Sequence, residues 1–354
     1  MSRFFSEKYQ QLTPYVPGEQ PKDMRYVKLN TNESPFPPSP RAQQRAQEAL
    51  QNLQLYSDPE CRDLTQKAAQ VWNVGTKNIV FGNGSDEILN FAFMAFCDAA
   101  NPALFADITY GFYPVFARLN GIPYETVPLK EDFSIDPEDY IGKNRTIFLA
   151  NPNAPTGLAL PLQEIERIVR GNPDHVVVVD EAYVDFGAES AVPLTKQYDN
   201  LLVVQTFSKS RSMAGARLGL GIGSEALIRD LNTLRNSTNP YNINRMTMAA
   251  GIGALDDPEY FQTNCRIIAE NRVWTTEQLR KLGFTVVDSV TNFVFAMHPQ
   301  LDGDVLYEQL KQRGVLVRHF SAPRLACYNR ITIGSREQME ILLENVKQIM
   351  EELL

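Results

Sequence analysis

Short apolar runs alternate with longer amphipathic stretches from about residue 40 to residue 255. Nearly continuous apolar runs are typical of strands that helices cover on both faces, as in a mostly parallel sheet. The runs predict strands at 79–81, 103–108, 146–150, 176–179, 201–204 and 218–222. The stretches between them predict helices at 40–54, 60–72, 86–97, 111–120 and 161–170. This alternation predicts an α/β domain with a central sheet.

The pattern differs on both sides of this region. Seven prolines between Pro14 and Pro40 suppress regular structure and predict an extended arm over residues 1–38. After residue 257 the sequence predicts a long helix at 258–282, strands at 285–287, 292–295, 315–317 and 331–333, and helices at 303–313 and 335–353. We therefore expect a large domain over 39–257 and a smaller α+β domain over 258–354, with the arm packed on the small domain or on a dimer partner.

Composition excludes several classes of protein. The 354 residues suit two domains, and 44% are hydrophobic and 21% charged, as in a globular protein. The net charge of −8 argues against nucleic acid as a partner, because phosphate neutralisation needs clustered Lys and Arg. No apolar run is long enough to span a membrane, and the N-terminus lacks the apolar segment of a signal peptide. Four cysteines and three histidines without metal-ligand spacing predict no metal site and a reducing, cytoplasmic setting.

A lysine and an aspartate follow two of the predicted strands. Lys209 lies just beyond the run 201–204, and Asp180 ends the run 176–179. Ligands of open α/β sheets collect outside the carboxyl ends of the strands. A lysine that can form an imine and a carboxylate that can hold a pyridinium nitrogen are the two groups that a pyridoxal-phosphate enzyme needs most. The alternative interpretations are a solvated surface lysine and a helix-capping aspartate.

An anion site is predicted where the run 79–81 leads into the helix at 86–97. The connecting sequence is Gly-Asn-Gly-Ser-Asp-Glu. Glycines allow a ligand to approach the backbone closely, and free N–H groups at a helix start attract anions. The acidic side chains of Asp86 and Glu87 are expected to favour the helix dipole while pointing away from the anion. Ser208 and Arg217 would add a hydroxyl and a guanidinium, whereas an ordinary strand–helix turn is the alternative.

Three more residues that suit a cofactor ring follow predicted strands. Tyr110 could stack on the ring, Asn153 could reach it from a turn rich in proline, and the phenol of Tyr183 could donate to a ring oxygen. Each has an ordinary alternative, namely a core aromatic, a common loop composition and a tyrosine packed at a domain edge.

These pieces, in this order, resemble the fold-type-I pyridoxal-phosphate enzymes and, more narrowly, the histidinol-phosphate aminotransferases. The resemblance covers nearly the whole chain. The sequences that carry it lie at 14–18, 29–35, 56–59, 82–87, 180–183, 208–209 with Arg217, and 330–334. It implies a large domain with a mostly parallel mixed sheet flanked by helices, and a smaller α+β C-terminal domain.

The resemblance also implies a role for each site residue. Lys209 would bond to pyridoxal 5'-phosphate and shuttle a proton, Asp180 would hold the ring nitrogen, and Tyr183 the ring oxygen. Tyr110 would stack on the ring. The phosphate would be bound by Ser85 and Asp86 through their backbones, by Ser208 and Arg217 and, across a homodimer with shared active sites, by Tyr56 of the other subunit. The substrate would be bound by Tyr15, Asn32, Arg318 and Arg330, because a guanidinium suits both a carboxylate and a phosphate ester.

The chain departs from the family pattern at two positions. The family usually has an asparagine that contacts the ring oxygen where this chain has Ala154. Either Asn153 takes over this contact through a shifted loop, or Tyr183 makes it alone. At Asn329 an apolar residue is more usual, and the asparagine is expected to loosen the strand that begins at Arg330.

The predicted reaction is a transamination between histidinol phosphate and a 2-oxo acid, 2-oxoglutarate. One alternative is an aminotransferase of aromatic amino acids. A second is a pyridoxal-phosphate decarboxylase of a phosphorylated amino acid such as threonine phosphate. A non-catalytic regulator of the same fold would need an appended DNA-binding domain, for which this chain has neither a basic module nor spare length.

Overall fold

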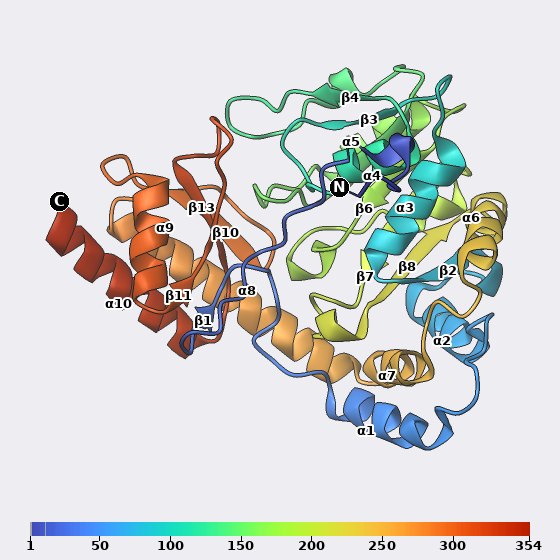
Figure 1. Ribbon diagram of the computed structural model, residues 1–354, viewed down its shortest axis with the longest axis horizontal. Coiled ribbons are helices and arrows are strands. Elements are labelled where there is room, and N and C mark those ends of the chain that lie inside the picture. Colours follow the sequence, from blue (N-terminus) through green and yellow to red (C-terminus); the bar gives the residue numbers. More distant parts are fainter. Residues whose placement is uncertain (1, 11) are drawn as a thin grey trace.

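A seven-stranded sheet forms the centre of the larger part of the molecule in the computed structural model, which describes residues 2–10 and 12–354 (Figure 1). Its strands, in spatial order, are β2 (Ile79–Asn83), β8 (Leu218–Gly223), β7 (Leu201–Thr206), β6 (Val177–Asp180), β5 (Thr146–Ala150), β3 (Ala103–Ala106) and β4 (Tyr124–Val127). Strand β8 is antiparallel to both of its neighbours, and the other pairs are parallel. The predicted α/β class with a mostly parallel mixed sheet is therefore confirmed.

Helices cover both faces of this sheet. The valines of strand β6 are buried on both faces of the sheet: Val178 packs into one hydrophobic cluster, and Val177 and Val179 pack into another. This explains the continuous apolar run in its sequence. The first cluster contains residues of α3 (Ser85–Phe96), α4 (Tyr113–Asn120) and α6 (Glu225–Thr238). The second contains residues of α2 (Arg62–Trp72), α5 (Leu162–Arg170) and α7 (Arg245–Leu255). Burial on both faces leaves the carboxyl ends of the strands as the place where polar groups meet a cavity.

The C-terminal domain has a sheet of its own. Its four strands, in spatial order, are β12 (Arg318–His319), β13 (Tyr328–Thr332), β10 (Phe293–Met297) and β9 (Thr285–Val286). The helices are α8 (Pro258–Lys281), α9 (Gly303–Gln312) and α10 (Arg336–Leu353), which starts at a capping box formed by Ser335 and Gln338. Asn329 does not interrupt β13, because it keeps its register with Ala296 and donates to the Gly303 carbonyl at 2.8 Å.

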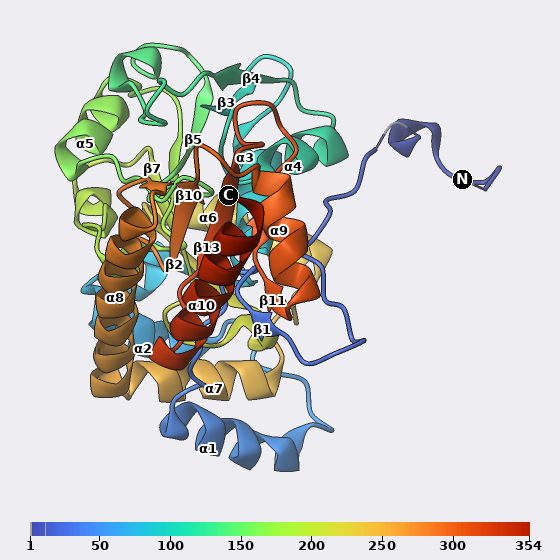
Figure 2. The ribbon, with the colours of Figure 1, turned by 90° about the vertical axis from the view of Figure 1, so that its left-hand side faces the viewer.

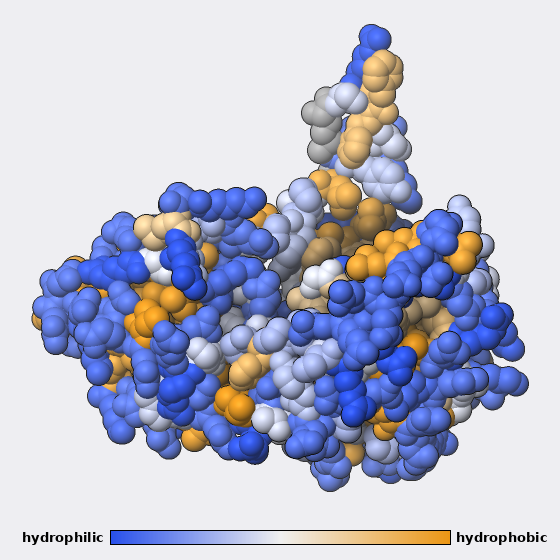
Figure 3. All heavy atoms as spheres, turned by 90° about the horizontal axis from the view of Figure 1, so that it is seen from below, coloured by the Kyte–Doolittle hydropathy of each residue, from blue (hydrophilic) through white to orange (hydrophobic). Residues whose placement is uncertain are grey.

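The N-terminal segment runs along both parts of the molecule. Residues 27–28 form a short strand, β1 (Val27–Lys28), parallel to β11 (Val315–Leu316), and α1 (Pro40–Ala49) packs on α7. Residues 2–10 project from the body of the molecule (Figures 2 and 3), whereas Tyr15, Pro17 and Gly18 line a cavity within it. The sequence predicted the arm but not β1, β4, β12, α6 or α7. The domain bounds at residues 38 and 257 stay a prediction, and α8 begins at Pro258.

In the part of the chain that the structure describes, no helix combines the length and the apolar character that crossing a membrane requires.

We predict that Gly219→Ala destabilises the fold, because β8 passes close to the start of α3 at this residue. A Cβ at Gly219 would lie 2.3 Å from the Ser85 nitrogen and 2.5 Å from the Gly84 carbonyl carbon, so backbone would have to move. Overpacking of this kind costs about 1–3 kcal/mol. Denaturant unfolding measures the loss. Gly215→Ala is the control, because a Cβ there meets no atom within 4 Å. Equal unfolding midpoints for the two variants would contradict the prediction.

Candidate active site

A cavity of about 160 Å³ lies at the carboxyl ends of β5, β6 and β7. Its lining residues come from these strand ends, the start of α3, the arm and the segment after β7, and they include Ser85, Asp86, Tyr110, Asp180, Tyr183, Ser208, Lys209 and Arg217. A second cavity of about 540 Å³ adjoins it and shares seven of these lining residues, namely Thr31, Asp86, Tyr110, Ala154, Tyr183, Lys209 and Arg217. A cavity of about 620 Å³ between α2, β2 and α6 is larger than both and shares no residue with either, so volume alone does not identify the active site.

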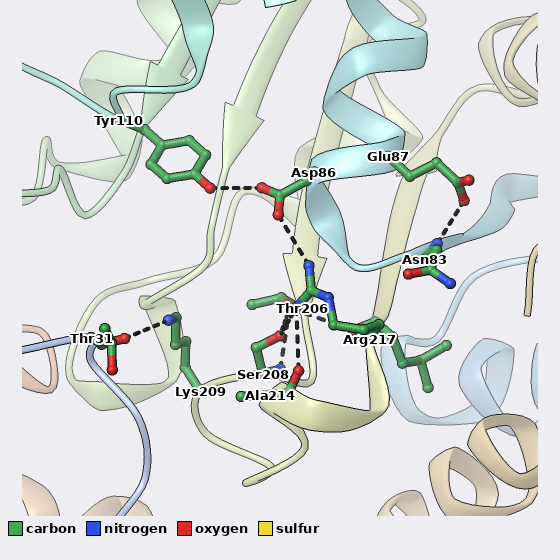
Figure 4. A network of polar contacts seen from close by, with 11 residues as sticks. Thr31, Asn83, Asp86, Glu87, Tyr110, Thr206, Ser208, Lys209, Ala214 and Arg217 are labelled. Atoms are coloured by element: carbon green, nitrogen blue, oxygen red, sulfur yellow. Dashed lines mark hydrogen bonds and ion pairs between the residues drawn. The ribbon is translucent and has the colours of Figure 1, made fainter. Parts of the chain in front are cut away.

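Lys209 directs its amine toward the arm. The Nζ atom donates to the Thr31 carbonyl at 3.2 Å (Figure 4). It lies 5.8 Å from the centre of the Tyr183 ring. Among the described residues no carboxylate lies within ion-pair distance of this amine. A lysine that lines a cavity without a fixed counter-ion is available for covalent and proton-transfer chemistry.

Asp180 is a buried carboxylate at the end of β6. Burial raises its pKa to about 7, against the lowering effect of a hydrogen bond from Tyr113. The Tyr113 hydroxyl donates to Oδ2 at 3.0 Å, and the Ala182 backbone nitrogen donates to Oδ1 at 3.2 Å. A buried carboxylate is stabilised by a cation. A cavity that ends on this group fits a ligand with a cationic ring nitrogen.

Tyr113 is a site residue that the sequence analysis missed. Its side chain is fully buried beneath Tyr110, with ring centroids 5.7 Å apart and ring planes at 87°. Tyr113 is the first residue of α4, three residues after Tyr110, and its backbone nitrogen donates to the Tyr110 carbonyl at 3.2 Å in the turn that leads into the helix. The spacing of the two tyrosines in the sequence could have marked Tyr113 as a site residue. Only the folded structure shows that its hydroxyl reaches Asp180.

The opposite end of the smaller cavity forms an anion cradle. Gly84 has φ +78°, and a Cβ there would lie 2.4 Å from Nη2 of Arg217, so the cradle needs a glycine. Ser85 begins α3, and the Ser208 hydroxyl accepts from Arg217 Nη1 at 3.3 Å. Backbone N–H groups at a helix start, a hydroxyl and a guanidinium fit a phosphate.

The structure corrects the expected orientation of Asp86. Its carboxylate does not point away from the cradle, because it accepts from the Tyr110 hydroxyl at 2.7 Å and from Arg217 Nη2 at 3.0 Å (Figure 4). Glu87 does point away, since it accepts from the Asn83 backbone nitrogen and from the Asn242 amide, both at 2.6 Å. Asp86 therefore aligns the guanidinium and the phenol that flank the cavity.

The structure does not bring Asn153 into the cavity. Its side-chain oxygen accepts from the Thr109 hydroxyl at 2.8 Å, and its amide nitrogen donates to the Ile108 carbonyl at 2.9 Å and to Thr156 at 3.2 Å. The neighbouring Ala154 lines both cavities instead. Of the two alternatives for the contact with the ring oxygen, this geometry favours Tyr183 alone, because the Asn153 amide is engaged by Ile108 and Thr109, which follow β3, and by Thr156.

The expected substrate residues surround the larger cavity. Tyr15 stacks on Phe112 with centroids 4.2 Å apart, and Asn32 donates to the Tyr183 hydroxyl at 2.9 Å. Arg318 is near the surface and donates to the backbone of the arm. Burial lowers the pKa of Arg330, whose Nη2 donates to the Asn30 carbonyl at 3.1 Å while its Nε has no partner among the described residues. An underused guanidinium in a cavity suits an anionic substrate.

Tyr56 lies outside both cavities. Its side chain is 78% exposed and stacks on Tyr241 with centroids 4.4 Å apart. Within one chain it therefore has no part in the site.

A family model described as aminotransferase class I and II matches residues 25–346. The chain belongs to this family. It is 48% identical over 353 residues to the histidinol-phosphate aminotransferase of Brachyspira hyodysenteriae, covering 99% of this chain and 100% of that one. It is 49% identical over 345 residues to that of Pseudomonas putida, covering 97% and 99%. The structure of histidinol-phosphate aminotransferase from Sinorhizobium meliloti in complex with pyridoxal-5'-phosphate is 25% identical, with a TM-score of 0.86 and coverage of 93% and 92%.

We predict that Tyr113→Phe weakens cofactor binding by this aminotransferase without unfolding it. The change removes only the hydroxyl that donates to Asp180, so the pKa of Asp180 rises further and its ionised form becomes less favourable. A hydrogen bond to a charged group contributes about 1.5–3 kcal/mol, which corresponds to roughly ten- to hundredfold in affinity. Absorbance titration of the cofactor-free protein with pyridoxal 5'-phosphate measures it.

Tyr140→Phe is the matched control for this experiment. Tyr140 is equally buried, but its hydroxyl has no hydrogen-bond partner in the described chain, and it lines neither cavity. We expect this variant to bind the cofactor like the wild type. Unchanged affinity in the Tyr113 variant would show that the hydroxyl does not support Asp180.

Proposed function

We propose that this aminotransferase transfers the amino group of L-histidinol phosphate to 2-oxoglutarate, giving imidazole-acetol phosphate and glutamate in histidine biosynthesis. Pyridoxal 5'-phosphate is the cofactor. One observation carries the proposal. The cavity that contains Lys209 and Asp180 opens into a second cavity lined by Arg318 and Arg330, so the reacting amine and a binding site for a substrate anion are adjacent. Relatives 48% and 49% identical over nearly the whole chain are named for this activity.

The residues around the smaller cavity suit the cofactor at each of its ends. Asp180 would pair with the ring nitrogen, and Tyr183 would donate to the ring oxygen. Tyr110 would lie against the face of the ring. The phosphate would be held by the backbone at Ser85 and Asp86 and by the side chains of Ser208 and Arg217. The ion pair with Asp86 balances part of the positive charge of Arg217 and holds its guanidinium beside the cavity when no phosphate is bound.

Bound pyridoxal 5'-phosphate supplies an electron sink for the bond that breaks at the substrate's α-carbon. Lys209 would hold the cofactor covalently until the amino donor replaces it. Its freed amine would then take the proton from the α-carbon of the donor and deliver it to the cofactor, so that the amino group stays on the cofactor when the oxo product leaves. The Thr31 carbonyl, 3.2 Å from Nζ, keeps the free amine at the cavity. Asp180 would stay ionised opposite the ring nitrogen, supported by the hydroxyl of Tyr113.

Recognition of the donor would use charge at one end and aromatic contact at the other. Arg330 and Arg318 would bind the phosphate ester of histidinol phosphate and, in the second half of the reaction, a carboxylate of the 2-oxo acid. Tyr15, stacked on Phe112, offers an aromatic surface to the imidazole ring. The arm that carries Tyr15 therefore forms one wall of the substrate cavity.

We propose further that two copies form a homodimer with shared sites. Large apolar side chains are exposed beside Tyr56, namely Leu50, Leu53, Leu55 and Tyr241. The arm also carries the exposed side chains of Phe4 and Val16, which are 81% and 68% exposed. Exposed apolar groups concentrated in this way favour a protein partner. Tyr56 would reach the phosphate of the other subunit's cofactor.

The cytoplasmic location expected from the sequence stays a proposal.

The half-reaction tests the substrate. Addition of histidinol phosphate without a 2-oxo acid should convert the yellow absorbance of the holoenzyme to the spectrum of the pyridoxamine form. Lys209→Ala, which retains the other cofactor contacts, should bind cofactor but give no conversion. A yellow holoenzyme that fails to respond to histidinol phosphate but responds to phenylalanine or tyrosine would replace the proposed donor with an aromatic amino acid. Carbon dioxide release from threonine phosphate would replace transamination with decarboxylation.

Subunit mixing tests the shared site. In a mixed dimer of Lys209→Ala and Tyr56→Phe subunits, one of the two sites contains both native residues, so activity at limiting cofactor should exceed that of either parent. Lys209→Ala mixed with Asp180→Ala should show no gain, because these two residues belong to the same subunit's site. Sedimentation of the wild type should give the mass of two chains. Absence of a gain in the first mixture would refute the role of Tyr56 across the interface.

A further inference from the structure

The hydroxyl of Tyr183 has a defined direction in its hydrogen bonding. Tyr183 is 9% exposed and lines both cavities. Its oxygen accepts from Nδ2 of Asn32 at 2.9 Å, and no described residue accepts its hydrogen. A phenol that accepts one hydrogen bond still has its own hydrogen to donate. The hydrogen of Tyr183 is therefore free for a ligand in the cavity.

The amide of Asn32 is held in a single orientation. Thr332 Oγ1 accepts from the Asn32 backbone nitrogen at 3.0 Å and donates to Oδ1 of Asn32 at 3.1 Å. Since Oδ1 is used as an acceptor, Nδ2 is the atom that faces Tyr183. Asn292 donates to the Asn32 carbonyl at 3.0 Å, and Asn32 has φ +54°. Contacts with the C-terminal domain thus fix the donor that holds Tyr183.

No amide shares this task with Tyr183. Ala154 presents a methyl group to both cavities. Both hydrogens of the Asn153 amide are used, one by the Ile108 carbonyl and one by Thr156, and its oxygen accepts from Thr109. Among the described residues that line the smaller cavity, the phenols are Tyr110 and Tyr183, and Tyr110 donates its hydrogen to Asp86. Tyr183 is therefore the phenol of this cavity with a hydrogen left to donate.

We propose that Asn32 is a positioning residue of the cofactor site, which keeps Tyr183 as the single side-chain donor to the ring oxygen of the cofactor. The inference rests on the proposed function, in which Tyr183 faces that oxygen. A donated hydrogen bond from Asn32 also strengthens the one that Tyr183 makes, because hydrogen bonds in a chain polarise one another. Asn32 therefore affects the electron distribution of the ring without touching it.

The same contact links the cofactor to the substrate anion. Arg330 and Thr332 are two residues apart in β13, so their side chains lie on the same face of that strand. Arg330 donates to the Asn30 carbonyl, and Thr332 holds Asn32. Arg330, the expected anion-binding residue, and Thr332, the residue that orients Asn32, thus share one strand face.

The test is the pH midpoint of the holoenzyme's yellow absorbance. Loss of the proton from the cofactor–lysine linkage leaves a full negative charge on the ring oxygen, and a donor to that oxygen favours this form. Tyr183→Phe should raise the midpoint by about one pH unit, and Asn32→Gly by about half a unit, as expected for the loss and the weakening of one hydrogen bond. Glycine accepts the positive φ of residue 32, so the backbone contacts remain.

A double-mutant cycle separates an effect through Tyr183 from a general effect on the arm. In the Tyr183→Phe background, Asn32→Gly should leave the midpoint where Tyr183→Phe places it. Asn30→Ala is the control, because the Asn30 side chain donates to the Glu19 carbonyl and does not contact Tyr183. It should leave the wild-type midpoint unchanged. Lys209 and Arg330, the charged groups facing Tyr183, are kept in all variants.

The outcomes distinguish the two proposals. If Tyr183→Phe moves the midpoint and Asn32→Gly does not, the positioning role of Asn32 is refuted while the function stands. The role is also refuted if Asn32→Gly moves the midpoint equally in both backgrounds. If the protein binds no cofactor, or Tyr183→Phe has no effect on the midpoint, the proposed cofactor contacts themselves are wrong. A shift by Asn32→Gly only in the presence of Tyr183 supports the inference.

Discussion

The site is organised around one unfavourable burial, that of the Asp180 carboxylate at the end of β6. Burial raises its pKa to about 7, and the two donors it has, Tyr113 and the Ala182 backbone, supply no charge. In the proposed function the ring nitrogen of the cofactor supplies a cation to this carboxylate, in the cavity that Asp180 lines. The parallel register that sets Asp180 opposite Val204 of β7 places Lys209, five residues later, on the same cavity. Covering both faces of the sheet with helices is what makes this burial possible.

Sequence analysis anticipated most of the residues that line the cavity. Four of them follow an apolar run in the sequence, namely Ser85, Asp180, Ser208 and Lys209. The carboxyl ends of neighbouring parallel strands meet at one edge of a sheet, independent of the conformation of the loops. The directions in which the side chains point could not be predicted in the same way. Asp86 and Glu87 are adjacent acidic residues in the first turn of α3, yet one turns to Arg217 and the other to Asn242. Such choices depend on partners distant in the chain, as does the contact of Tyr113 with Asp180.

Strand β4, helix α7 and strand β1 were missed because each lacks the sequence pattern that marked the other elements. Strand β4 is at the edge of the sheet, so its residues are half-buried or exposed and lack the apolar run that marked its neighbours. Helix α7 is rich in small and apolar residues all round, and Gly253 is needed there because α1 passes 2.5 Å from the position of a Cβ. A helix buried on most sides has no amphipathic period to detect. Strand β1 has two residues and exists only through its pairing with β11.

Three consecutive residues of the arm contact three different parts of the site. The Asn30 carbonyl accepts from Arg330, the Thr31 carbonyl accepts from the Lys209 amine, and the Asn32 amide donates to Tyr183. A transaminase has to hold an anion, move a proton and stabilise charge on a ring in a fixed spatial relation. Because three consecutive residues make these contacts, two through backbone carbonyls and one through a side-chain amide, the position of the arm sets that relation as a whole. The prolines that flank this stretch prevent it from joining regular structure elsewhere, so the composition that marked the arm as irregular is also what makes it available for this role.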